Sequence, residues 1–117
     1  MPAMAIAAEH VAILRRFSMS ALDFMRRRVD LVGTVSVLTA KALQLTQAVS
    51  GAEMEMQRLS LEIDRDPANE QLVQELHDQE QSAAAIRREQ ADCAEDIAAA
   101  ERDVAALDVL IAAAKGE

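Results

Sequence analysis

Residues 59–76 read LSLEIDRDPANEQLVQEL, and this stretch decides the fold. Leu59 and Ile63 end one apolar repeat, and Leu72 and Leu76 begin a second. Both repeats alternate steps of three and four residues, which is the spacing of a coiled-coil helix. The step from Ile63 to Leu72 breaks this spacing and contains Pro67. The chain is therefore predicted to turn there, because one straight coiled coil would keep the repeat in phase.

The two repeats extend far on either side of this turn, from Leu14 to Ile63 and from Leu72 to Ala114. Antiparallel pairing matches them layer by layer, with no layer skipped. The sequence therefore predicts an all-α fold, a long antiparallel helical hairpin of coiled-coil type, as a single domain over residues 1–117. The predicted intrachain core is Leu31, Val35, Leu38, Leu45, Val49, Leu59, Ile63, Leu72, Leu76, Ile86, Ile97, Val104, Leu107 and Ile111.

The expected boundaries follow from local signals. We predict a first helix over residues 3–64, a turn over 64–70 and a second helix over 67–114. Asp66 is expected to cap the second helix, with Pro67 at its first position, where the missing N–H costs nothing. Gly33 and Gly51 interrupt neither pattern, so the first helix is read as continuous.

The composition suggests that one hairpin does not bury all of its apolar surface. Hydrophobic residues make up 51% of the chain and aromatic residues only 2%. The first helix carries apolar residues outside its repeat, and a helix apolar on more than one side is buried on more than one side. We therefore expect hairpins to oligomerise into a bundle or filament. The predicted oligomer interface is Leu22, Met25, Val29, Val32 and Leu43.

The charge of the chain is uneven. The formal net charge is -8; residues 1–58 carry seven basic and five acidic side chains, and residues 59–117 carry five basic and fifteen acidic ones. An acidic chain repels phosphates, so nucleic acid is not an expected partner. The densest cluster, Arg26, Arg27 and Arg28, is predicted to lie near Asp103 and Asp108. It is interpreted as an interhelical ion-pair cluster, with an acidic partner or anionic lipid as the alternative.

The sequence lacks the signals of membrane insertion and secretion. No apolar run reaches the ~20 residues of a transmembrane helix, and charged residues interrupt the N-terminal region where a secretory signal would need an apolar core. Residues 1–28 form a basic amphipathic stretch, so contact with a membrane surface remains an alternative. Cys93 is the sole cysteine and falls in the repeat, as a buried apolar side chain or as an intermolecular disulfide. The compartment is unknown, and a reducing one is compatible.

Nothing in the sequence predicts catalysis. His10 and His77 are isolated from further ligands, so no metal and no cofactor is expected. There is no phosphate-binding glycine loop and no nucleophile–base constellation. We expect a non-enzymatic structural or assembly protein, a coiled-coil building block or adaptor within a larger complex. Other helical proteins are possible partners, and the alternatives are a small chaperone or carrier for a client helix and a peripheral membrane-binding protein.

The turn suggests one concrete form of assembly. Two long helices joined by Asp66-Pro67-Ala68-Asn69 are similar to the hairpin subunits of bacterial type III secretion needles. The likeness covers the turn. Glu70 stands where that family has a second proline, and the second helix lacks aromatic residues, so the chain is not assigned to the family. The resemblance implies a filament subunit as one version of the assembly hypothesis.

Overall fold

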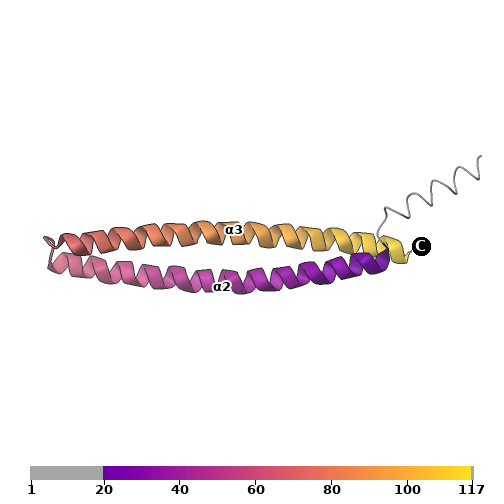
Figure 1. Cartoon of the computed structure of the whole chain (residues 1–117), viewed down its shortest axis with the longest axis horizontal. Helices are drawn as coiled ribbons and strands as arrows, with labels where there is room; N and C mark the ends of the chain where they lie inside the picture. Colours follow the sequence, from indigo (N-terminus) through magenta and orange to yellow (C-terminus); the bar gives the residue numbers. More distant parts are fainter. Residues whose placement is uncertain (1–19, 117) are drawn as a thin grey trace, which may run out of the picture. The chain divides into compact units, whose positions relative to one another are not determined.

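Two long helices dominate the structure, which is a computed structural model that describes residues 20–116. Helix α2 spans Ala21–Arg65 and helix α3 spans Glu70–Lys115, and the two run in opposite directions (Figure 1). The described residues contain no strand and no cis peptide bond. The predicted antiparallel helical hairpin is confirmed. Its assembly into a bundle or filament stays a prediction.

The chain divides into two compact units, and each holds a segment of both helices. Unit 1 combines Met1–Gly33 with Glu101–Glu117, of which residues 20–33 and 101–116 are described. Unit 2 is Thr34–Ala100 and contains the turn.

The N-terminus of α2 is fixed by a reciprocal cap. The hydroxyl of Ser20 accepts a hydrogen bond from the Asp23 N–H at 3.2 Å, and the Asp23 carboxylate accepts one from the Ser20 N–H at 3.2 Å. This pairing is a capping box, which satisfies backbone donors that a helix start leaves open. The prediction of an unbroken helix from residue 3 is wrong at this point, because residue 20 is not helical and α2 begins at Ala21. The rest of that predicted start, residues 3–19, lies outside the described residues.

The turn between the helices differs in detail from the prediction. The Asn69 N–H donates to the Asp66 carbonyl at 3.1 Å, which closes a β-turn with Pro67 in its second position. Within residues 20–116, no non-glycine residue has a positive φ, so the turn is of type I, in which proline is favoured at its second position. Asn69, not Asp66, caps α3: its side-chain oxygen accepts from the N–H groups of Gln71 at 3.1 Å and Leu72 at 3.4 Å.

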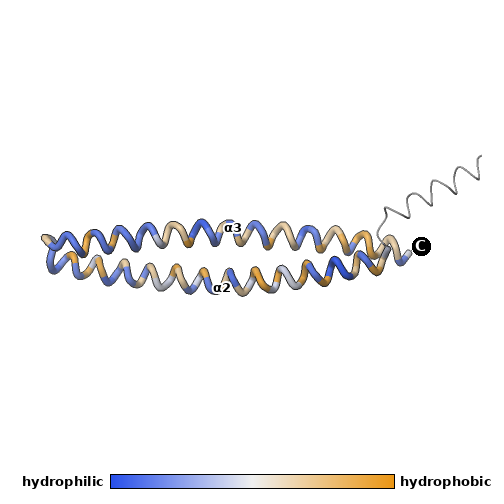
Figure 2. The backbone as a smooth tube through the Cα atoms, in the orientation of Figure 1, coloured by the Kyte–Doolittle hydropathy of each residue, from blue (hydrophilic) through white to orange (hydrophobic). Residues whose placement is uncertain are grey.

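The buried side chains follow the two repeats. Among the described residues, every repeat position of α2 and α3 is buried or half-buried. The most enclosed side chains are Ala83 at 0%, Leu59 at 1% and Cys93 at 2% exposure. Of the residues predicted as core, Leu45, Leu59, Leu107 and Ile111 are buried, and the other ten are half-buried. Apolar residues recur along both helices between polar ones (Figure 2).

Contacts across the hairpin agree with the predicted register. In unit 2, the Cys93 thiol donates to the Leu38 carbonyl at 3.3 Å, and Arg87 donates to Glu53 at 2.9 Å. In unit 1, Arg28 donates to Asp108 at 2.6 Å. The Arg28–Asp108 contact lies next to a predicted layer, and the other two contacts each join two neighbouring layers of the predicted pairing. Within each unit, the segments of α2 and α3 therefore pack in the expected register.

Candidate interaction surface

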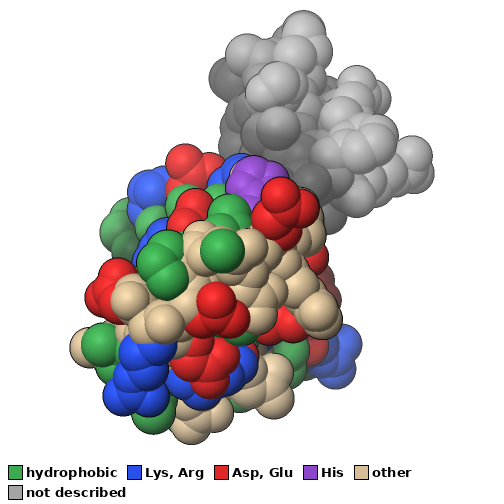
Figure 3. Space-filling view, turned by 90° about the vertical axis from the view of Figure 1, so that its left-hand side faces the viewer, with side chains coloured by type: hydrophobic (Ala, Val, Ile, Leu, Met, Phe, Trp, Pro, Cys, Tyr) green, Lys and Arg blue, Asp and Glu red, His purple; other side chains and the backbone are tan. Residues whose placement is uncertain are grey.

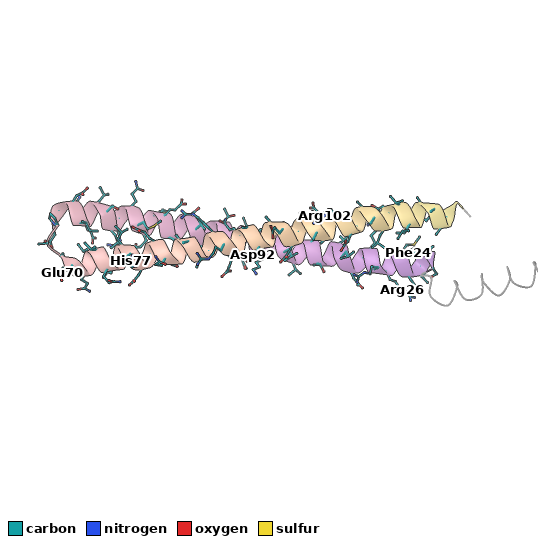
Figure 4. All side chains as sticks on the ribbon, turned by 90° about the horizontal axis from the view of Figure 1, so that it is seen from above. Phe24, Arg26, Glu70, His77, Asp92 and Arg102 are labelled. Carbon is teal, nitrogen blue, oxygen red and sulfur yellow. The ribbon has the colours of Figure 1, made fainter. Side chains whose placement is uncertain are left out.

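The feature that stands out in unit 1 is an apolar surface on α2. Leu22 is 55% exposed, Val29 68% and Val32 41%, while Met25 is half-buried. Leu22, Met25 and Val29 line an open groove together with Arg26. Figure 4 shows Phe24 directed toward α3 and Arg26 on the opposite side of α2. The helix therefore packs one side inside the unit and presents a second apolar side outward.

The heptad positions of the exposed residues define this surface. With the buried repeat taken as positions a and d, Met25 and Val32 are at e, and Leu22 and Val29 are at b. In an antiparallel pair, the e positions of both helices flank the core on one side and the g positions flank it on the other. The Arg28–Asp108 ion pair marks the e side of unit 1, since Asp108 is at e of α3. We call the e and b positions of both helices in unit 1 the e/b face.

The g side of unit 1 has a different character. Arg27 and Asp103, both at g, line a groove together with Leu31, Ala106 and Leu107. The predicted charge cluster is thus spread over three places: Arg28 pairs with Asp108, Arg27 and Asp103 share the g-side groove, and Arg26 lies on the outer side of α2. The side chains of Arg28 and Asp108 are 42% and 51% exposed, so this ion pair contributes little stability by itself.

Unit 2 is predominantly polar outside its core. The Thr34–Ala100 segment carries five basic and thirteen acidic side chains, a net charge of -8. Figure 3 views the turn and shows acidic side chains on its surface. Apolar exposure in this unit is scattered: Leu43 is 61% exposed, Met54 71% and Leu61 55%. Leu43, the last residue of the predicted interface, is at b, whereas Met54 and Leu61 are at f on another side of α2.

Ion pairs along α2 in unit 2 perturb one carboxylate. Arg58 donates to Glu55 and, at 2.6 Å, to Glu62. The hydrogen bond from Arg58 and the positive charge of its guanidinium lower the pKa of the Glu55 carboxyl below its usual value, against an opposing effect of desolvation. All three side chains are more than a third exposed, so the arrangement is a solvated helix surface and does not resemble a catalytic site.

Two repeat residues of unit 2, Gln90 and Cys93, make side-chain hydrogen bonds. Gln90 donates to the Thr46 hydroxyl at 3.5 Å, and that hydroxyl donates to the Ala42 carbonyl at 3.0 Å. The Cys93 thiol is enclosed and bonded to the Leu38 carbonyl. An intermolecular disulfide through Cys93 would require this packed position to open.

Clusters of metal-ligating side chains and membrane-spanning helices are both absent from the described residues. Among them, no group of three or more His, Cys, Asp and Glu residues is placed to hold a metal ion. Neither α2 nor α3 contains a window long and apolar enough to cross a membrane. The alternative of membrane-surface contact rests largely on residues 1–19, which lie outside the described part of the chain.

Sequence reasoning missed some exposed apolar residues. Val37 is 71% exposed and Val73 49%, and α3 of unit 1 exposes Val109 at 69% and Leu110 at 45%. Their sequence signal is simple: each is a branched aliphatic residue that falls outside the a and d positions.

Comparison with known proteins adds no relative. No protein-family model, no curated protein and no solved structure matches the chain.

Proposed function

We propose that this protein is a non-enzymatic assembly protein, a helical hairpin that oligomerises with further copies as a structural building block or adaptor. The observation that carries the proposal is the row of exposed aliphatic side chains on α2, above all Leu22, Val29 and Leu43. Burying one such side chain is worth roughly 1.5–3 kcal/mol. A hairpin that leaves several aliphatic side chains exposed therefore gains free energy when it associates with another chain that covers them.

The internal packing of the hairpin supports the same proposal. Alanine occupies three repeat positions of α3, Ala83, Ala100 and Ala114, so the layers that contain them bury little apolar volume. The most enclosed residues are themselves small, with Leu59 the one large side chain below 2% exposure among the described residues. Two-stranded helical structures with so thin a core depend on further packing for stability. Helix bundles supply that packing by adding further helices around a shared core.

A mass measurement tests the proposal. We expect the full chain to form a defined oligomer by light scattering during size-exclusion chromatography, and to lose mass on serial dilution. The variant Val29→Glu with Leu43→Glu should have a lower mass and remain helical by circular dichroism. The control Val37→Glu with Met54→Glu adds the same charge at two equally exposed apolar positions elsewhere on α2 and should keep the wild-type mass.

Two results would count against the proposal. A wild-type mass of one chain at every concentration would show that the exposed residues of α2 do not join copies. The class of client-binding carriers would then gain support, since such a protein stays small until its client is present. Equal loss of mass in both double variants would show that added charge, and not the site, opposes association.

A further inference from the structure

We infer that the partner on the e/b face of unit 1 is the same face of a second copy, with α2 of each copy lying over α3 of the other. This inference rests on the proposed function and specifies its partner and contact. It starts from what α3 presents beside the exposed residues of α2.

From Ala84 to Ala112, every b position of α3 holds a small residue. Five successive heptads place alanine there, and no other residue type occurs between the first and the last of these positions. The b positions of α2 in unit 1 are large, with Leu22 and Val29. The five alanines of α3 are Ala84, Ala91, Ala98, Ala105 and Ala112.

The large and small residues lie at matching levels of unit 1. Val29 and Ala105 are both next to the layer of the Arg28–Asp108 ion pair, and Leu22 and Ala112 lie one heptad further along. Ala105 and Ala112 are exposed, as are Leu22 and Val29. Each hairpin therefore has two such pairs on this face, Val29 beside Ala105 and Leu22 beside Ala112.

A second copy related by a two-fold axis parallel to the helices of unit 1 fits this pattern. That operation places Val29 of each copy over Ala105 of the other, and Leu22 over Ala112. Alternating large and small residues across facing positions lets side chains interdigitate without voids. A two-fold contact is self-complementary, so one surface supplies both halves. A foreign client helix would have to supply matching small residues, whereas this chain already carries them.

The charges of unit 1 permit such a contact. Its described residues carry five basic and five acidic side chains, a net charge of zero. The ionised side chain nearest the middle of the face, Arg28, is already paired with Asp108 at 2.6 Å. Two further charged residues, Glu101 and Lys115, lie at exposed e positions of α3 toward the two ends of the face and carry opposite charges. The face together with Arg28 is therefore neutral, so two copies can meet here without a net like-charge repulsion. On α2, the e and b positions of unit 2 are polar beyond Leu43, and Glu53 at e pairs with Arg87 of α3, so the large apolar residues of α2 at these positions end there.

A size substitution tests the face. Ala105→Leu fills the place expected for Val29 of the second copy and should weaken association at least tenfold in dissociation constant by light scattering with dilution. Ala106→Leu is the matched control, because this neighbouring exposed alanine lines the g-side groove instead. Both changes leave the hairpin core untouched, so both variants should stay equally helical. Wild-type association of Ala105→Leu would overturn the inference.

Crosslinking tests the pairing of helices. In a Cys93→Ala background, one chain carries Val29→Cys and a second, length-tagged chain carries Ala105→Cys. After mixing and treatment with a short bis-maleimide crosslinker, we expect the mixed product to dominate. Products joining two Val29→Cys chains, or no product from chains that light scattering shows to be associated, would overturn this contact and leave the proposed function standing. A wild-type chain that is monomeric throughout would defeat both.

Discussion

At the scale of single residues, the two caps show how local chemistry sets the ends of the helices. Ser20 and Asp23 satisfy each other's backbone N–H groups, and Asn69 serves α3 in the same way. The sequence contained both signals. The predicted start at residue 3 followed the apolar repeat past Ser20, and the choice of Asp66 as cap ignored that Pro67 suits a type I turn as well as a helix start.

The cap of α3 gives the first prediction. Asn69→Ala should lower the free energy of unfolding by about 1 kcal/mol, since it removes the acceptor for two N–H groups at the start of the helix. Asp66→Ala should cost less, because the Asp66 side chain accepts only the amide of Asn69 at 3.3 Å. Urea unfolding at one fixed protein concentration measures both. A larger loss for Asp66→Ala would return the cap to that residue.

The cap of α2 gives a pH prediction. Hydrogen bonds from the Ser20 hydroxyl and then the Ser20 N–H lower the pKa of Asp23 below its ordinary value of 3.8. A carboxyl with a lowered pKa in the folded state adds stability above its unfolded pKa, and that stability is lost as pH falls through the folded pKa. Other carboxyls titrate in the same range, so the difference between wild type and Asp23→Asn isolates this one. In thermal unfolding, the gap between the two proteins should close on acidification, and a gap that persists in strong acid would contradict the assignment.

At the scale of elements, the apolar repeat was enough to predict two antiparallel helices and their register. Contacts such as Cys93 with Leu38 join neighbouring layers of the predicted pairing. The repeat carries this information because a and d side chains must share one side of each helix. It carries less about the outer surface. Val109 and Leu43 are exposed in one hairpin. Whether a partner covers them depends on other molecules, about which the sequence of this chain carries no direct signal.

The difference between inner and outer leucines can be measured on one helix. Leu59 is 1% exposed, and Leu61, two residues on, is 55% exposed. Leu59→Ala should cost about 2–5 kcal/mol of stability, because it removes packed methyl groups and leaves a cavity. Leu61→Ala should cost much less and serves as the matched control. Similar losses in urea unfolding would mean that Leu61 is also buried, against another copy or a partner.

Gly51 offers a change in the opposite direction. It lies inside α2, and a Cβ built on it would meet nothing within 4 Å apart from its own helix backbone and chain neighbours. Gly51→Ala should therefore raise the free energy of unfolding by about 0.8–1 kcal/mol through helix propensity alone. A loss of stability, measured by the same urea titration, would show that this side of α2 is covered when the protein assembles.

At the scale of the whole molecule, charge decides how association responds to its surroundings. The formal charge of -8 is concentrated in unit 2, while the described part of unit 1 is neutral. An assembly joined through the e/b face is stabilised by the burial of apolar side chains. The same assembly brings the acidic unit 2 segments of several chains together, and these segments repel one another. Repulsion between exposed charges is screened by salt, with a Debye length of about 10 Å at 0.1 M.

The last prediction follows from this balance. Raising sodium chloride from roughly 0.02 M to roughly 0.5 M should strengthen association, because screening weakens repulsion between acidic segments and leaves apolar burial intact. The variant Asp92→Asn with Glu95→Gln neutralises two exposed carboxylates of unit 2 outside the e/b face, so it should associate more strongly at low salt and respond less to added salt. Light scattering with dilution measures both. Association that weakens with salt would mean that opposite charges join the copies, and the Arg26–Arg28 cluster of unit 1 would then have to meet the acidic surface of a neighbouring chain.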